Sequence, residues 1–182
     1  MRKRNNQKAF TLIELLMVIG IIGLLAVMAV AAVKIAQQKA RIAKVQNDIN
    51  EIYKAISAMA NDTGTWPGHQ TIDEVNNSAN NEICADGCTF GLSSPQAGIV
   101  ATDGSYGGWN GPYMRQIPAD PWGNEYFFDT DYAIKNDGSN EPCDGGVIGA
   151  DCIEVVVVGS YGPDGIGNEQ YNRDDIIKIV AK

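Results

Sequence analysis

Residues 8–25 read KAFTLIELLMVIGIIGLL, a stretch in which a single acid, Glu14, stands near the front of a long apolar run. The run continues without a charged residue from Leu15 to Val33. As a helix rising about 1.5 Å per residue it spans about 28 Å, close to the thickness of the hydrocarbon core of a bilayer. A cleaved secretory signal has a shorter apolar region followed by a small-residue cleavage site. The stretch therefore predicts a membrane-spanning helix that stays in the protein.

The apolar run passes directly into residues 34–60, in which hydrophobic residues recur every three, four or seven positions. That spacing places them on one side of a helix. Neither proline nor glycine occurs between Gly23 and Gly64, so we expect one continuous helix from about Phe10 to Ala60. The hydrophobic residues on this side of the helix form a stripe, which consists of Ile35, Ile42, Val45, Ile49, Ile52, Ile56 and Met59. We predict that the stripe faces the folded domain, and the alternative is that it faces a coiled-coil partner.

After Gly64 the sequence is rich in turn residues and in short β-branched or aromatic runs. Such runs between turns are typical of strands, and the unbroken VVVV at 155–158 favours a buried one. A small antiparallel sheet laid on the helix would cover the apolar stripe, which gives an α+β fold. We expect strands near Tyr126–Asp129, Ile153–Ser160 and Ile176–Val180.

The formal net charge is −8, although basic residues stand at positions 2, 3, 4 and 8. The rest of the chain is therefore more acidic still, which argues against a nucleic-acid partner because phosphates are held by basic groups. The negative charge of an acidic domain instead favours binding of a cation or repulsion of unwanted partners. The single histidine, His69, and the lack of Ser-His-Asp, HExxH or P-loop patterns argue against an enzyme.

Four cysteines follow the apolar run as two close pairs, Cys84 with Cys88 and Cys143 with Cys152. An even number in loops of a membrane-targeted chain favours disulfides in an oxidising compartment. Of the pairings that four cysteines permit, we prefer the two local ones. The alternative is a zinc site built from all four thiolates, although neither pair has the C-x2-C spacing of such sites. Basic residues flank the apolar run on both sides, so the cysteines decide the orientation and place the C-terminal part outside the cytosol.

KAFTLIELLMVIGIIGLL resembles the class III signal of type IV pilins and type II secretion pseudopilins. Those proteins have a short basic leader, a cleavage site before a phenylalanine, and a glutamate at the fifth residue after the cut. The resemblance implies a leader at residues 1–9 and cleavage between Ala9 and Phe10 by a prepilin peptidase, followed by N-methylation of Phe10. It also implies that Glu14 acts in assembly by pairing with the Phe10 amine of a neighbouring subunit. Ala9 stands where the family usually has glycine.

Three further blocks resemble the major pseudopilin of type II secretion. Residues 61–68, NDTGTWPG, are similar to the turn that closes the long helix of that family. Residues 110–128, NGPYMRQIPADPWGNEYFF, resemble its G-x-Y-x-x-x-L-P-x-D-P-W-G-N-x-Y block. Residues 155–176, VVVVGSYGPDGIGNEQYNRDDI, are similar to its calcium-loop segment.

The last of these blocks implies calcium as a cofactor. Calcium takes about six to eight oxygen ligands, which are carboxylates and backbone carbonyls in mixture. By composition alone, an Asp/Gly/Asn loop on an acidic protein is a solvated loop, so the expectation depends on the resemblance. The implied ligands are the carbonyl of Tyr161, the acids Asp164 and Asp175, Asn172 at a Ser/Thr position, and Asp174 as an additional carboxylate.

The expected fold is thus a pilin-like α+β chain with a long N-terminal helix and a C-terminal calcium-loop region. We predict a leader at 1–9, a transmembrane and assembly helix at 10–33, an amphipathic helix at 34–60, and a globular domain at 61–182. Within that domain, residues 69–105 and 136–152, which hold the cysteines, are predicted insertions.

The resemblance implies a subunit of the periplasmic pseudopilus that drives export of folded proteins, anchored in the bacterial inner membrane before assembly. The implied partners are other copies of the chain, minor pseudopilins, the prepilin peptidase and the inner-membrane assembly platform. One alternative is a type IV pilin of a surface fibre for adhesion, motility or DNA uptake. Another is a single-pass, calcium-binding anchor that does not polymerise.

Overall fold

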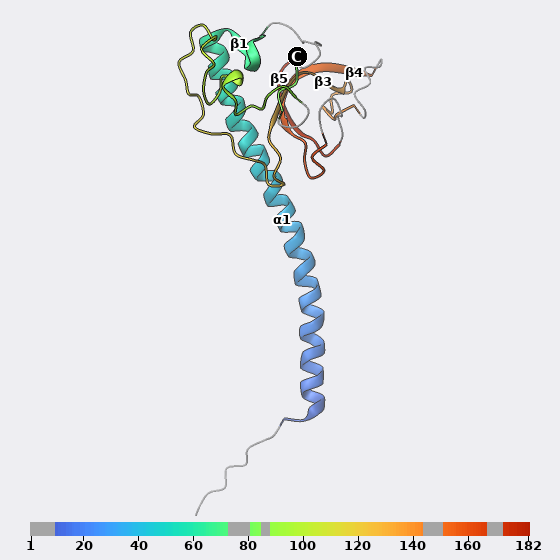
Figure 1. The fold of residues 1–182 in the computed structure, drawn as a ribbon. Coiled ribbons are helices and arrows are strands. Elements are labelled where there is room, and N and C mark those ends of the chain that lie inside the picture. Colours follow the sequence, from blue (N-terminus) through green and yellow to red (C-terminus); the bar gives the residue numbers. More distant parts are fainter. Residues whose placement is uncertain (1–9, 73–80, 85–87, 144–150, 167–172) are drawn as a thin grey trace, which may run out of the picture. The chain divides into compact units, whose positions relative to one another are not determined.

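The computed structural model describes residues 10–72, 81–84, 88–143, 151–166 and 173–182. The chain divides into two compact units, residues 1–42 and 43–182. The helix α1 (Leu12–Thr63) begins in the first unit and ends in the second (Figure 1). The predicted leader, including Ala9, lies outside the described residues.

The helix α1 is the long helix predicted from the sequence, with different ends. It extends three residues beyond the predicted end at Ala60, where the Thr63 hydroxyl donates to the Met59 carbonyl at 2.8 Å. Gly64 then takes a left-handed conformation, φ 72°, and its N–H donates to the Ala60 carbonyl at 2.8 Å. A left-handed glycine directly after the last turn is a common way to end a helix. The NDTGTWPG block therefore closes the helix, as expected.

In the second unit, antiparallel strands form a sheet in the order β3-β4-β5. A smaller antiparallel pair, β1 and β2, follows the end of α1. Short 3-10 helices, η1 and η2, lie in the segment between α1 and β3. The bounds are β1 (Thr65–Trp66), η1 (Pro67–His69), β2 (Gln70–Thr71), η2 (Pro95–Ala97), β3 (Phe127–Lys135), β4 (Cys152–Ser160) and β5 (Ile176–Ala181).

The strand β3 is longer than the predicted Tyr126–Asp129 and continues to Lys135. The register of β3 against β4 shifts between Asp129 and Tyr132, which marks a β-bulge. Two acids interrupt the apolar pattern at this bulge, Asp129 and Asp131, so the sequence did not show a continuous strand. The other two strands agree with their predicted positions to within one residue at each end.

The sheet carries apolar side chains on both faces. One face packs on the second-unit part of α1, where Ile49, Ile52 and Ile56 contact the cluster that includes Phe128 and Val158. This packing confirms the predicted α+β arrangement of a long helix on a small antiparallel sheet. The stripe is buried from Val45 onward, whereas Ile35 is 59% exposed.

A buried hydrogen bond fixes where the sheet lies on the helix. The Tyr126 hydroxyl donates to the Asp48 carboxylate at 2.8 Å, and Lys44 also pairs with Asp48. Burial, followed by the hydrogen bond to Asp48, raises the pKa of the Tyr126 hydroxyl. A buried bond to a charged group stabilises by about 1.5–3 kcal/mol, so this contact selects one register of helix and sheet.

Described residues of the predicted insertion at 69–105 contribute to the core. Leu92, Ala97 and Ile99 are buried in the same cluster as the helix stripe. Ile83 forms an antiparallel bridge with Phe128 of β3, with N–H···O distances of 2.8 and 3.0 Å. Residues 81–84 therefore lie along the free edge of β3.

Candidate functional site

The start of α1 is held by a reciprocal contact between Thr11 and Glu14. The Thr11 backbone N–H and hydroxyl each donate to the Glu14 carboxylate at 2.8 Å. In return, the Glu14 N–H lies 3.4 Å from the Thr11 hydroxyl oxygen. This is the capping box, in which an N-cap Thr and a Glu three residues later satisfy each other's backbone donors. It explains why the helix begins at Leu12 and not at the predicted Phe10.

The capping box is a role of Glu14 that the sequence analysis missed. Its signal was present, because T-x-x-E before an apolar run is a recognised start of a helix. Phe10 precedes the cap and is 82% exposed. In a chain cut before Phe10, the new amino group would lie one residue before the capping threonine.

The described part of the first unit exposes an almost unbroken apolar surface. Large hydrophobic side chains from Phe10 to Ile35 are exposed. An 18-residue window of α1 reaches a mean hydropathy of 2.9, and none of it is buried. By length and composition, α1 is thus able to cross a membrane, which fits a membrane-anchored protein.

The C-terminal loop brings together two of the predicted calcium ligands. The Asp164 N–H lies 3.3 Å from the Asp174 carboxylate, and the Asp164 carboxylate accepts from the Ile166 N–H at 2.9 Å. A Cβ on Gly162, which has φ 68°, would lie 2.2 Å from the Asp174 carbonyl oxygen. The loop can therefore close on itself in this way only with glycine at position 162.

The other predicted ligands are placed differently. The Asp175 carboxylate accepts from the Tyr132 hydroxyl at 2.6 Å and is largely buried. The Tyr161 side chain is also buried, and its hydroxyl donates to Glu82. Asn172 lies outside the described residues. The structure thus groups Asp164 with Asp174 at the surface and directs Asp175 toward the sheet.

Asp120, in the DPWGN block, joins this loop to the rest of the domain. One of its carboxylate oxygens accepts from the N–H groups of Trp122 and Asn124, each at 2.9 Å. The other accepts from the Ser160 hydroxyl at 2.6 Å, at the end of β4. Asp120 is buried, and its carboxylate is the hydrogen-bond acceptor for these three donors.

The same block also contacts the loop directly. The Asn124 side-chain amide donates to the Gly162 carbonyl at 3.1 Å, and the Gly162 N–H donates to the Ser160 hydroxyl at 3.1 Å. The block is therefore a packed corner that positions the start of the loop. Sequence analysis found this block only as a family resemblance, and it did not identify Asp120, Asn124 or Ser160 as the link.

All four cysteines form the two local disulfides, Cys84–Cys88 and Cys143–Cys152. A zinc site of four thiolates is not compatible with this pairing, because disulfide sulfurs are not thiolates. The Cys84 and Cys88 sulfurs lie within 4.8 Å of the Glu82 carboxylate, but for the same reason they do not offer zinc ligands there.

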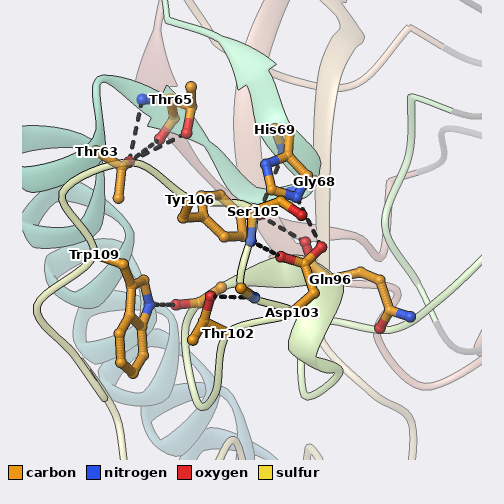
Figure 2. A network of polar contacts seen from close by, with 12 residues as sticks. Thr63, Thr65, Gly68, His69, Gln96, Thr102, Asp103, Ser105, Tyr106 and Trp109 are labelled. Atoms are coloured by element: carbon orange, nitrogen blue, oxygen red, sulfur yellow. Dashed lines mark hydrogen bonds and ion pairs between the residues drawn. The ribbon is translucent and has the colours of Figure 1, made fainter.

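The single histidine belongs to a network next to the end of α1 (Figure 2). His69 Nε2 lies 2.9 Å from the Asp103 carboxylate, and its ring stacks on Tyr106 at 3.9 Å between centroids. The Tyr106 hydroxyl accepts from the Gly68 N–H at 2.9 Å and donates to the Gln96 carbonyl at 2.6 Å. These contacts tie η1 to η2, so His69 has a packing role in this structure.

Residues 4–30 match the family model of the prokaryotic N-terminal methylation motif. Comparisons with curated proteins and with solved structures give no match. The matched segment contains the predicted cleavage position before Phe10, the capping residues Thr11 and Glu14, and most of the apolar run. Together with the long helix packed on a small antiparallel sheet, the motif supports a type IV pilin-like protein.

Proposed function

We propose that this chain is the major pseudopilin of a type II secretion system. Its role is to polymerise into a periplasmic filament that drives folded proteins through an outer-membrane channel. The observation that carries the proposal is the methylation motif at residues 4–30, which is a feature of filament-forming structural subunits and not of enzymes. The corner at Asp120 favours a pseudopilin among such subunits. Asp120 and Asn124 lie in residues 110–128, the block that resembles the major pseudopilin, and they contact Ser160 and Gly162 at the start of the C-terminal loop.

Processing precedes assembly in this proposal. A prepilin peptidase cuts between Ala9 and Phe10 and methylates the new Phe10 amine. The exposed apolar surface of α1 holds the mature chain in the inner membrane until it is added to the filament. The two disulfides support a periplasmic location for the C-terminal domain, because disulfides persist in oxidising compartments.

Assembly in this proposal depends on the charge of Glu14. An acid within a bilayer costs about 2.5–3.5 kcal/mol on insertion scales, and it is retained when it has a partner. The Phe10 amine of a neighbouring subunit supplies that partner and sets the axial register of the filament. The other partners are minor pseudopilins and the inner-membrane assembly platform.

The second candidate function is a type IV pilin subunit of a surface fibre. The Cys143–Cys152 disulfide favours it, because such pilins often end in a disulfide-bounded loop. Immunogold labelling of the C-terminal domain in the native host separates the two functions. Label confined to the periplasm at native expression supports the pseudopilus, and labelled fibres on the cell surface contradict it.

We further propose that the C-terminal loop binds calcium. Asp164 and Asp174 support the proposal because the Asp164 N–H donates to the Asp174 carboxylate, which brings two acids together in one loop, and carboxylates are ligands that calcium takes. The Tyr161 carbonyl, Asn172 and Asp175 complete the proposed ligand set. The Asn124 contact holds the start of the loop at Gly162, and bound calcium would hold the rest of the loop in place.

Removal of calcium is expected to lower the melting temperature of the full-length protein in detergent. An ion at a hundred times its Kd stabilises by about 2.7 kcal/mol, which corresponds to about 5–10 °C for a chain of this size. Differential scanning fluorimetry with calcium and with EGTA measures the shift. We expect Asp164→Asn to reduce the shift, and Glu51→Gln, which changes an exposed acid on α1, to leave it unchanged. An Asp164→Asn/Asp174→Asn variant that responds to calcium like the wild type would contradict the loop site.

A further inference from the structure

Three cations stand directly after the apolar run of α1. Lys34 is the first residue after the run, and Lys39 and Arg41 follow within two turns of the same helix. All three are exposed, and so are the residues between them. No acid occurs in residues 15–47, so the segment has only positive charges. We call Lys34, Lys39 and Arg41 the basic collar.

The basic collar has no acidic neighbour along α1. Side chains three or four residues apart are neighbours on a helix, and Lys44 pairs with Asp48 in this way. The positions three and four residues from each member of the collar hold no acid. The charges of the collar are therefore not neutralised by the helix that carries them.

The basic collar lies on the side of the membrane where basic residues are least expected. The two disulfides support a periplasmic location for the part of the chain after the apolar run. Lys and Arg beside a membrane-spanning helix are normally enriched on the cytoplasmic side. The basic residues before the run, at positions 2, 3, 4 and 8, all belong to the predicted leader. A chain cut before Phe10 would lose them and keep the collar.

The basic collar reaches the depth of the lipid headgroups when the apolar run spans a bilayer. At the rise of an α-helix, the distance from Lys34 to Arg41 is about 10 Å. The headgroup region adds about 5–8 Å on each side of the hydrocarbon core. Long Lys and Arg side chains also bend toward headgroups while their stems cover apolar surface. All three charges are therefore within reach of lipid phosphates.

The distribution of the basic collar around the helix favours lipids over a single protein partner. Lys34 and Arg41 are about two turns apart and share a side of α1. Lys39 lies about 140° around the helix axis from Lys34, at 3.6 residues per turn. Headgroups border a membrane-spanning helix on all sides, whereas one docked copy of the chain would cover one side.

We propose that the basic collar binds the phosphate groups of anionic phospholipids in the periplasmic leaflet. The inference rests on the membrane anchoring of the proposed function and adds a lipid partner to it. Each Lys or Arg near a negatively charged membrane surface strengthens binding by about fivefold. The bound headgroups would hold the mature chain at a fixed depth after the leader is removed, and they would have to be released when the chain enters the filament.

Native mass spectrometry of the full-length chain tests the proposal, because it weighs the lipids that stay bound. The chain is reconstituted in vesicles of equal parts dioleoyl phosphatidylglycerol and dioleoyl phosphatidylcholine, and is then released in mild detergent. Glutamine replaces the leader cations at positions 2, 3, 4 and 8 in every sample, so that the leader attracts no lipid. We expect a chain with an intact collar to retain phosphatidylglycerol over phosphatidylcholine by at least about fivefold.

The collar variant Lys34→Gln/Lys39→Gln/Arg41→Gln is expected to retain the two lipids equally. A second collar variant exchanges Lys for Arg and Arg for Lys at the same positions. It keeps the charge, so we expect it to keep the preference for phosphatidylglycerol.

The matched control is Lys54→Gln/Arg115→Gln/Lys182→Gln, which removes the same number of exposed cations from the second unit. We expect this control to retain phosphatidylglycerol like the chain with an intact collar. A glutamine variant of the collar that behaves like the control would overturn the proposal. Dimers that depend on the collar, without any lipid preference, would also overturn it, because they would assign the collar to the acidic domain of a second copy.

Failure of this proposal is distinguishable from failure of the proposed function, because filaments are measured in a separate experiment. Filaments formed by a chain without the lipid preference would reject only the lipid partner. A lipid preference in a chain that forms no filaments would reject only the proposed function.

Discussion

Glutamine in place of Glu14 is expected to abolish filament assembly while leaving the start of α1 intact. Glutamine serves in a capping box as glutamate does, so the contacts with Thr11 remain possible. The substitution removes the negative charge, and with it the proposed attraction to the Phe10 amine of a neighbouring subunit. A bond to a charged group contributes about 1.5–3 kcal/mol, so each docking step should weaken by roughly tenfold or more.

The measurement is the fraction of chain recovered in sheared or cross-linked filaments, compared with the amount in the membrane. Thr11→Ala is the matched control, because it removes the capping hydroxyl and keeps the charge of Glu14. We expect Thr11→Ala to assemble and Glu14→Gln to accumulate in the membrane as monomer. The reverse result would show that Glu14 acts as a helix cap and not as a docking charge.

Replacing Asp120 by alanine is expected to destabilise the second unit by about 3 kcal/mol or more, because one buried and two part-buried donors lose their acceptor. The N–H groups of Trp122 and Asn124 and the Ser160 hydroxyl all donate to this one carboxylate. Domains are typically stable by about 5–15 kcal/mol, so the loss is a large share. Because Asn124 also holds the Gly162 carbonyl, the C-terminal loop should open with the corner.

Urea unfolding of the full-length protein in detergent, followed by tryptophan fluorescence, measures the change in the free energy of unfolding. Asp120→Asn is the matched variant, since its side-chain oxygen can still accept from the two backbone N–H groups. We expect it to cost about 1 kcal/mol. A loss below about 0.5 kcal/mol for Asp120→Ala would mean that the corner does not support the loop.

The long helix and the sheet were predictable because their signals are local and periodic. The spacing of Ile49, Ile52 and Ile56 identified the side of α1 that packs on the domain, and VVVV identified the central strand β4. The methylation motif could also be recognised from the sequence, because it lies within one continuous segment. The Thr11–Glu14 cap was present in the sequence as T-x-x-E.

The remaining features depend on contacts between residues that are far apart in the chain. The sequence did not single out Asp120, because its partner Ser160 lies at the end of β4, 40 residues later. Glu82 faces Asp129 only because residues 81–84 add to the edge of β3, and no spacing rule connects the two. The length of β3 was also missed. The bulge places two acids, Asp129 and Asp131, within the strand, and the apolar pattern in the sequence therefore ended the predicted strand at Asp129.

Mass spectrometry of the mature chain from its native host tests whether it is a processed filament subunit. We expect an N-terminus at Phe10 that carries one methyl group, with cleavage after Ala9. It also predicts that Cys84–Cys88 and Cys143–Cys152 are found as the disulfide-linked peptides. A mature chain that retains residues 1–9, or begins at an unmethylated residue other than Phe10, would contradict the assignment as a processed filament subunit.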